Sequence, residues 1–94
     1  MSMKEAYKQK IEAELEMVQA KLGEFKAQAK ISTADARIKY AKQIEEIELG
    51  IDTTKAKLNE LGEAGEGAWE QIKTSVESAW GKLRAAVENT TTAP

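Results

Sequence analysis

The chain has 94 residues, of which 32% are charged, 41% hydrophobic and 5% aromatic, and its formal net charge is −2. This length fits one domain at most, and a composition so poor in large apolar residues is typical of long helices rather than of a compact globule. The 14 basic and 16 acidic residues are interspersed along the chain. Because this balance gives no electrostatic attraction to phosphates, we expect no nucleic-acid partner.

Residue types that carry much of enzyme chemistry are missing from the sequence. It contains no Cys and no His, which excludes disulfides, thiol nucleophiles and imidazole bases. The first residues lead into charged sequence, so we expect no secretory signal, and no apolar run approaches the roughly 18 residues that span a bilayer. We therefore predict a soluble, cytoplasmic protein.

The clearest pattern is an apolar stripe with helical period. It steps by four and three residues from Ile11 to Ala29, and again from Tyr40 to Leu61. Such stripes form the seams of coiled coils, where side chains pack as knobs into holes. The two seams can be joined into one stripe whose average number of residues per turn is close to that of an undistorted helix. One long coiled-coil helix over about residues 3–61 is therefore the favoured prediction.

An alternative is that this helix is broken near residues 31–35. Ser32 to Asp35 resemble a capping box with Ser32 as the N-cap residue and the Asp35 carboxylate in place of the usual Glu. However, no Gly or Pro lies between Gly23 and Gly50, whereas a tight helical hairpin usually contains such a turn residue. Both the continuous helix and the hairpin remain open at this point.

A glycine-rich segment at residues 62–67 is the predicted turn. Gly62 is expected to follow the helix as its C′ residue, with Gly65 and Gly67 allowing the chain to reverse. A second, shorter helix over about 68–88 then carries one apolar face that includes Trp69 and Trp80. Residues 89–94 are expected to fray. The predicted fold is all-α, an antiparallel helical bundle in a single domain.

No residues are predicted to be catalytic, to bind a cofactor or to ligate a metal. Two groups of carboxylates are candidates for metal binding, Glu12, Glu14 and Glu16 and then Glu45, Glu46 and Glu48. Positions this close along a helix point in different directions, so we expect these carboxylates to be solvated. Ser and Thr hydroxyls have no His to activate them, and the glycines lack the strand and the Lys of a phosphate-binding loop. The chain is therefore predicted not to be an enzyme.

The apolar stripes are instead predicted to be interaction surfaces. A continuous helix would leave a long seam exposed, which implies a homo-oligomer, most simply an antiparallel dimer. The hairpin alternative would give three helices that could close as a monomer. The predicted interaction residues are Ile11, Leu15, Val18, Leu22, Phe25, Tyr40, Ile44, Ile47, Ile51, Leu58, Leu61, Trp69, Ile72, Val76, Trp80 and Leu83.

The helix with two Trp residues has two candidate partners. Its indoles lie three turns apart on one side and can dock on protein, or they can lie on a membrane or lipid surface. Between Glu66 and Glu88 the charges sum to −1, from three basic and four acidic residues, without the basic excess of most membrane-surface helices. Protein binding is favoured, and a protein coating lipid or hydrophobic granules, as phasins and apolipoproteins do, is the alternative.

Several segments also resemble a known family. They are Ala34–Ala36, Tyr40, Gln43–Glu45, Leu58–Leu61, Gly65, Ala68–Glu70, Ala79–Trp80 and Leu83. Together they are similar to short bacterial coiled-coil proteins linked to stress responses, over roughly residues 4–88. The resemblance implies a long charged helix, a Gly-containing turn and an amphipathic helix with two Trp, and it implies no catalytic or ligand residues. The predicted function is a non-enzymatic structural or interaction protein that self-associates and binds as yet unknown protein partners.

Overall fold

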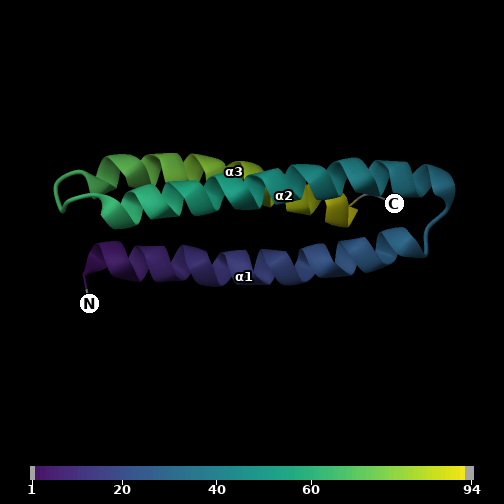
Figure 1. Ribbon diagram of the computed structural model, residues 1–94, viewed down its shortest axis with the longest axis horizontal. Coiled ribbons are helices and arrows are strands. Elements are labelled where there is room, and N and C mark those ends of the chain that lie inside the picture. The colour runs from purple at the N-terminus through teal and green to yellow at the C-terminus, as the bar shows by residue number, and fades with distance from the viewer. Residues whose placement is uncertain (1, 93–94) are drawn as a thin grey trace.

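The computed structural model describes residues 2–92, which form three α-helices and, within that range, no β-strand. Helix α1 spans Met3–Lys30, α2 spans Ala34–Glu63 and α3 spans Trp69–Thr92. The helices run antiparallel in chain order and form a rod of 51 × 19 × 18 Å (Figure 1). The predicted all-α helical bundle is confirmed.

The long helix is broken at residues 31–33, so the hairpin alternative describes the chain. The N-cap residue of α2 is Thr33, whose hydroxyl accepts a hydrogen bond from the Ala36 amide at 3.3 Å, and not Ser32 as the capping box predicted. Ser32 instead donates its hydroxyl to the Gln28 carbonyl at 2.7 Å. The Arg37 guanidinium donates to the Lys30 carbonyl. These contacts satisfy helix-end groups of both α1 and α2, which explains a turn without Gly or Pro.

The second turn also differs from its prediction. Gly62 lies inside the last turn of α2 rather than after it, and α2 ends at Glu63 with an extended Ala64 as its C-cap. No described residue has a positive φ, so none of the glycines here is needed for a left-handed conformation. Helix α3 begins at Trp69 and continues to Thr92, so 89–92 are helical rather than frayed. The remaining residues of the predicted tail, 93 and 94, lie outside the described residues.

The core is a single apolar cluster drawn from all three helices. Its most deeply buried apolar side chains are Ile47 and Leu61 of α2 and Val76 and Leu83 of α3. Thr54 is also completely buried, and its hydroxyl donates to the Gly50 carbonyl one turn earlier at 2.8 Å. This intrahelical bond satisfies the hydroxyl, so a polar residue can occupy a core position of the seam.

The three helices do not pack on one another equally. Helix α2 contacts both α1 and α3 extensively, whereas α1 and α3 approach each other at few points. A Cβ placed on Gly50 of α2 would lie 2.9 Å from the Leu83 Cδ1 atom of α3, so the absence of a side chain permits their close approach. The bundle therefore has a closed α2–α3 flank and a more open flank between α1 and α3.

Candidate functional site

The structure places the predicted interaction residues mainly inside the chain's own core. The buried ones are Ile11, Leu15, Val18, Leu22, Ile47, Ile51, Leu58, Leu61, Val76 and Leu83, and the partly buried ones are Phe25, Tyr40, Ile44, Trp69, Ile72 and Trp80. Folding brings together side chains from both seams and from the apolar face of α3. Most of these residues are therefore occupied by intramolecular packing.

A groove of about 450 Å³ runs along the open flank between α1 and α3. We call it the α1–α3 groove, and its lining residues are Glu14, Met17, Val18, Lys21, Trp80, Arg84, Val87 and Glu88. Val18 and Val87 belong to the buried core, and Trp80 is half-buried. Met17, by contrast, is 68% exposed although it is apolar. The groove thus combines an apolar floor with an exposed apolar side chain on its α1 wall.

Charged residues of both signs border the α1–α3 groove. On α3, Arg84 and Glu88 form an ion pair with 3.7 Å between nitrogen and oxygen, and both side chains are mostly exposed. On α1, Glu14 and Lys21 lie two turns apart, and neither forms an ion pair within the described part of the chain. An apolar strip bordered by mixed charges is the pattern that an amphipathic helix recognises.

An aromatic cluster closes one end of the open flank. The rings of Tyr7 on α1 and Trp69 on α3 lie 6.4 Å apart between centroids, with a tilt of 44°. The Lys73 ammonium lies 5.1 Å from the centre of the Tyr7 ring and 5.9 Å from that of Trp69. These distances permit favourable cation–π interactions. The cluster therefore joins α1 to α3 near the start of both helices.

The Tyr7 hydroxyl is inaccessible and has no hydrogen-bond partner in the structure. Burial raises the pKa of Tyr7 above its usual value of 10.0, and the negative charges of Glu77 and Glu14 raise it further. A buried hydroxyl without a partner weakens a contact that its ring stabilises. The cluster therefore joins α1 to α3 through its rings and leaves the Tyr7 hydroxyl without a hydrogen bond.

Lysines of α1 cover the C-terminal end of α2. The Lys4 ammonium donates to the carbonyls of Gly62 at 3.3 Å and Ala64 at 2.9 Å. A Cβ on Gly62 would lie 3.1 Å from the Lys8 Nζ atom, so this lysine also approaches the helix end closely. The last turn of α2 contains no basic residue of its own. Lys4 therefore supplies the positive charge that the C-terminal end of a helix dipole favours.

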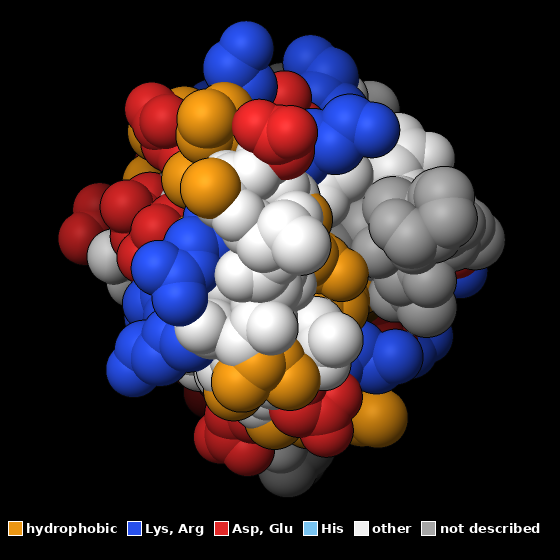
Figure 2. All heavy atoms as spheres, turned by 90° about the vertical axis from the view of Figure 1, so that its right-hand side faces the viewer, with side chains coloured by type: hydrophobic (Ala, Val, Ile, Leu, Met, Phe, Trp, Pro, Cys, Tyr) orange, Lys and Arg blue, Asp and Glu red, His pale blue; other side chains and the backbone are white. Residues whose placement is uncertain are grey.

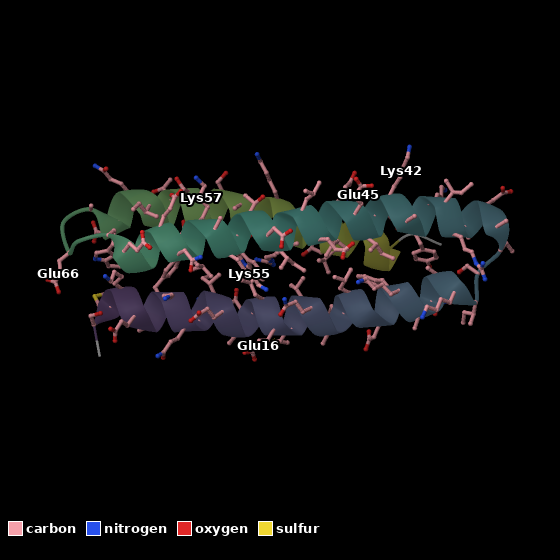
Figure 3. The ribbon with its side chains drawn as sticks, viewed as in Figure 1. Glu16, Lys42, Glu45, Lys55, Lys57 and Glu66 are labelled. Atoms are coloured by element: carbon pink, nitrogen blue, oxygen red, sulfur yellow. The ribbon has the colours of Figure 1, made fainter. Side chains whose placement is uncertain are left out.

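The carboxylates considered above show no arrangement for metal binding. Within residues described by the structure, no group of three or more acidic side chains could hold a metal ion. Figure 3 shows Lys42 and Glu45 projecting from the side of α2 that faces away from α1, and Glu16 projecting from the outer side of α1. These side chains cover the surface of the rod and do not converge.

The end of the rod at the α1–α2 turn carries two exposed apolar residues, Ile31 and Ile38. In the end-on view of Figure 2, apolar side chains lie in separate groups among Lys, Arg, Asp and Glu. The apolar side chains visible at this end are therefore interrupted by charged ones. Nor does any helix, over the residues described, have the length and apolar character needed to cross a membrane.

Sequence reasoning overlooked Met17, Arg84, Lys4 and Arg37 because none of them belongs to a seam. One signal could have identified the α1 wall of the groove. Beside the seam lies a second stripe, spaced again by four and three residues, which comprises Lys10, Glu14, Met17, Lys21 and Glu24. The capping lysine and arginine carry no comparable signal, because their roles depend on how the helices fold back.

Comparison with protein-family models, with curated proteins and with solved structures finds no match to this chain. The function must therefore be inferred from the geometry of the bundle and of the α1–α3 groove.

Proposed function

We propose that this chain is a non-enzymatic protein that works through helix–helix association, and that the α1–α3 groove receives a helix from another protein molecule. The observation that carries the proposal is the groove itself, in which Met17 stands exposed beside the half-buried Trp80. Three-helix packing leaves this flank uncovered because α1 and α3 contact α2 far more than each other.

The place of the groove between two helices and its chemistry suit a helical partner. An α-helix with its side chains is about 10 Å in diameter and packs at about 8–10 Å from its neighbours. A fourth helix laid over Val18 and Val87 would convert the open flank into a four-helix arrangement. Apolar contact with Met17 and Trp80 would supply most of the affinity, while the charged margins would orient the partner.

The alternative function, attachment to a lipid or granule surface, needs the bundle to open. The apolar face of α3 is buried, with Val76, Leu83 and Val87 inside the core. An interfacial helix must instead present that face to the lipid. Adding vesicles of neutral or anionic lipid and recording Trp emission distinguishes the two functions. A blue shift of the emission, together with protein that stays bound to the vesicles, would favour the lipid alternative. Unchanged emission would favour protein association.

The proposed function is tested by sedimentation of two matched variants. Met17→Glu places a charge in the α1–α3 groove, whereas Met3→Glu changes a similarly exposed residue of the same helix outside the groove. We expect the unchanged chain and Met3→Glu to sediment as the same associated species and Met17→Glu to dissociate. A monomer for the unchanged chain at every concentration, with no helical partner binding the groove, would contradict the proposal.

A further inference from the structure

The exposed stripe of α1 has an order of charges in which every sign is inverted when the helix is reversed. Its members are Lys10, Glu14, Met17, Lys21 and Glu24. Glu14 is half-buried and the other four are exposed. Residues 10, 17 and 24 are separated by seven residues, or about 10.5 Å along the axis, and 14 and 21 lie between them. The stripe therefore has Met17 near its centre, with Lys10 and Glu24 each seven residues away and Glu14 and Lys21 three and four residues away.

Reversing a second copy of α1 about Met17 pairs opposite charges at every step. Lys10 then lies level with Glu24 of the second copy, Glu14 lies within one residue of Lys21, about 1.5 Å along the axis, and the two Met17 side chains meet. A parallel, in-register arrangement would instead place each charge opposite its own copy, which is unfavourable. None of these four charged residues forms an ion pair within the described chain. The pattern therefore selects one orientation of one partner.

We propose that the occupant of the α1–α3 groove is a second copy of this chain, whose α1 lies antiparallel to the first with the two-fold axis at Met17. This inference rests on the proposed function and adds the identity and register of the partner. Each α1 would then lie over the groove of the other copy, with Met17 between Val18 and Trp80 of its partner's flank. The interface is isologous, so the same residues contribute from both sides.

The exposed surface of the single chain is large enough to supply such an interface. The chain has an accessible surface of 6336 Å². A compact monomer of its mass, 10.3 kDa, would expose about 5,400 Å². The excess of roughly 900 Å² reflects the elongated rod of 51 × 19 × 18 Å, whose long faces leave room for the area of about 800 Å² that one partner buries in a standard interface.

Cysteine cross-linking tests the register directly, because the chain contains no other Cys. Met17→Cys places two thiols across the proposed axis, and mild oxidation should convert most of the protein into a covalent dimer. Gln19→Cys is the matched control, since Gln19 is exposed on the same helix but faces the opposite groove between α1 and α2. We expect it to stay largely monomeric under the same conditions. Equal cross-linking of both variants would overturn the register.

Charge reversal tests the orientation without a covalent bond. Glu14→Lys places a lysine at position 14 near Lys21 of the second copy, at two symmetry-related places. The dissociation constant of the dimer should rise on the order of tenfold. Adding Lys21→Glu in the same chain restores opposite charges only in the antiparallel register, and should return the dissociation constant to near its original value. Far-ultraviolet circular dichroism checks that each variant retains its helices. No recovery in the double variant would contradict the antiparallel arrangement.

The outcomes separate this inference from the proposed function. Association that depends on the α1–α3 groove, without cross-linking at Met17 and without recovery in the double variant, would overturn the register and leave groove-mediated association in place. A monomer that nevertheless binds a foreign helix in the groove would overturn the second copy as occupant. Absence of any groove-dependent binding would overturn both proposals.

Discussion

The two flanks of α3 differ in how completely folding uses their apolar surface. Toward α2, the backbone at Gly50 approaches Leu83, and Leu83 is only 1% exposed. Toward α1, the helices approach at few points, among them the Tyr7–Trp69 ring contact, and the α1–α3 groove leaves Met17 exposed. The comparison shows that intramolecular packing can bury a heptad seam while a neighbouring stripe that includes Met17 remains exposed.

A large-to-small substitution on each flank should reveal the difference between the flanks most strongly. Leu83→Ala removes a buried side chain from the closed flank and should lower the free energy of unfolding by about 3 kcal/mol. Met17→Ala removes an exposed side chain and should change it by less than about 0.5 kcal/mol at concentrations where the chain is monomeric. Urea denaturation followed by circular dichroism measures both. Similar losses for the two variants would mean that Met17 is part of the folded core.

Two glycine substitutions should have opposite signs. In Gly23→Ala the added Cβ meets no atom within 4 Å, so the substitution should stabilise α1 by about 0.5–1 kcal/mol through its helix propensity. Ala at Gly50 gains the same propensity but forces α2 and α3 apart at Leu83, and we expect a net loss of about 1 kcal/mol. Thermal unfolding of the two variants under one set of conditions provides the measurement. Stabilisation by Gly50→Ala would show that the α2–α3 contact is looser than described.

Removing the Tyr7 hydroxyl should strengthen the contact of Tyr7 with Trp69 between α1 and α3. Tyr7→Phe keeps the ring beneath Lys73 and eliminates the buried oxygen without a partner, so we expect a gain of up to about 1 kcal/mol. Burial, and then Glu77 and Glu14, raise the pKa of Tyr7 in the folded chain. As pH rises above 10.0, Tyr7 therefore ionises first in the unfolded chain, and this lowers the free energy of unfolding.

The pH dependence supplies the control for the Tyr7 variant. The stability of Tyr7→Phe relative to the unchanged chain should increase as pH rises past 10, because only the unchanged chain has a Tyr7 hydroxyl to ionise. Denaturation midpoints measured between pH 8 and roughly 11 would reveal the trend. A constant difference across that range would show that the hydroxyl is better solvated than the structure indicates.

The smallest expected effect concerns Lys4. Lys4→Gln removes the ammonium from the carbonyls of Gly62 and Ala64 and should cost about 0.5 kcal/mol, since the group is partly exposed. Lys39→Gln, on an exposed position of α2, is the matched control for loss of one positive charge. Added salt should reduce the effect of the Lys4 variant. An equal effect of the two substitutions would contradict a specific role for Lys4 at the end of α2.

Much of the fold could be predicted from the sequence, because the spacing of Ile11, Leu15, Val18 and Leu22 determines which face of a helix is buried. The position of the break was less predictable. Ser32 and Thr33 are both good N-cap residues, and the contact from Arg37 to Lys30 arises only after the chain has reversed. The α1–α3 groove was not predictable from the seams, since it depends on how far apart two helices lie.

The mass of the unmodified chain in solution, measured by light scattering over a range of concentrations, tests the central claim most directly. If the α1–α3 groove is an association surface for a second copy, the mass should rise from 10.3 kDa toward twice that value with increasing concentration and remain there. A constant mass of 10.3 kDa up to high concentration would show that the three-helix bundle is stable without a second copy on its open flank, and would contradict self-association.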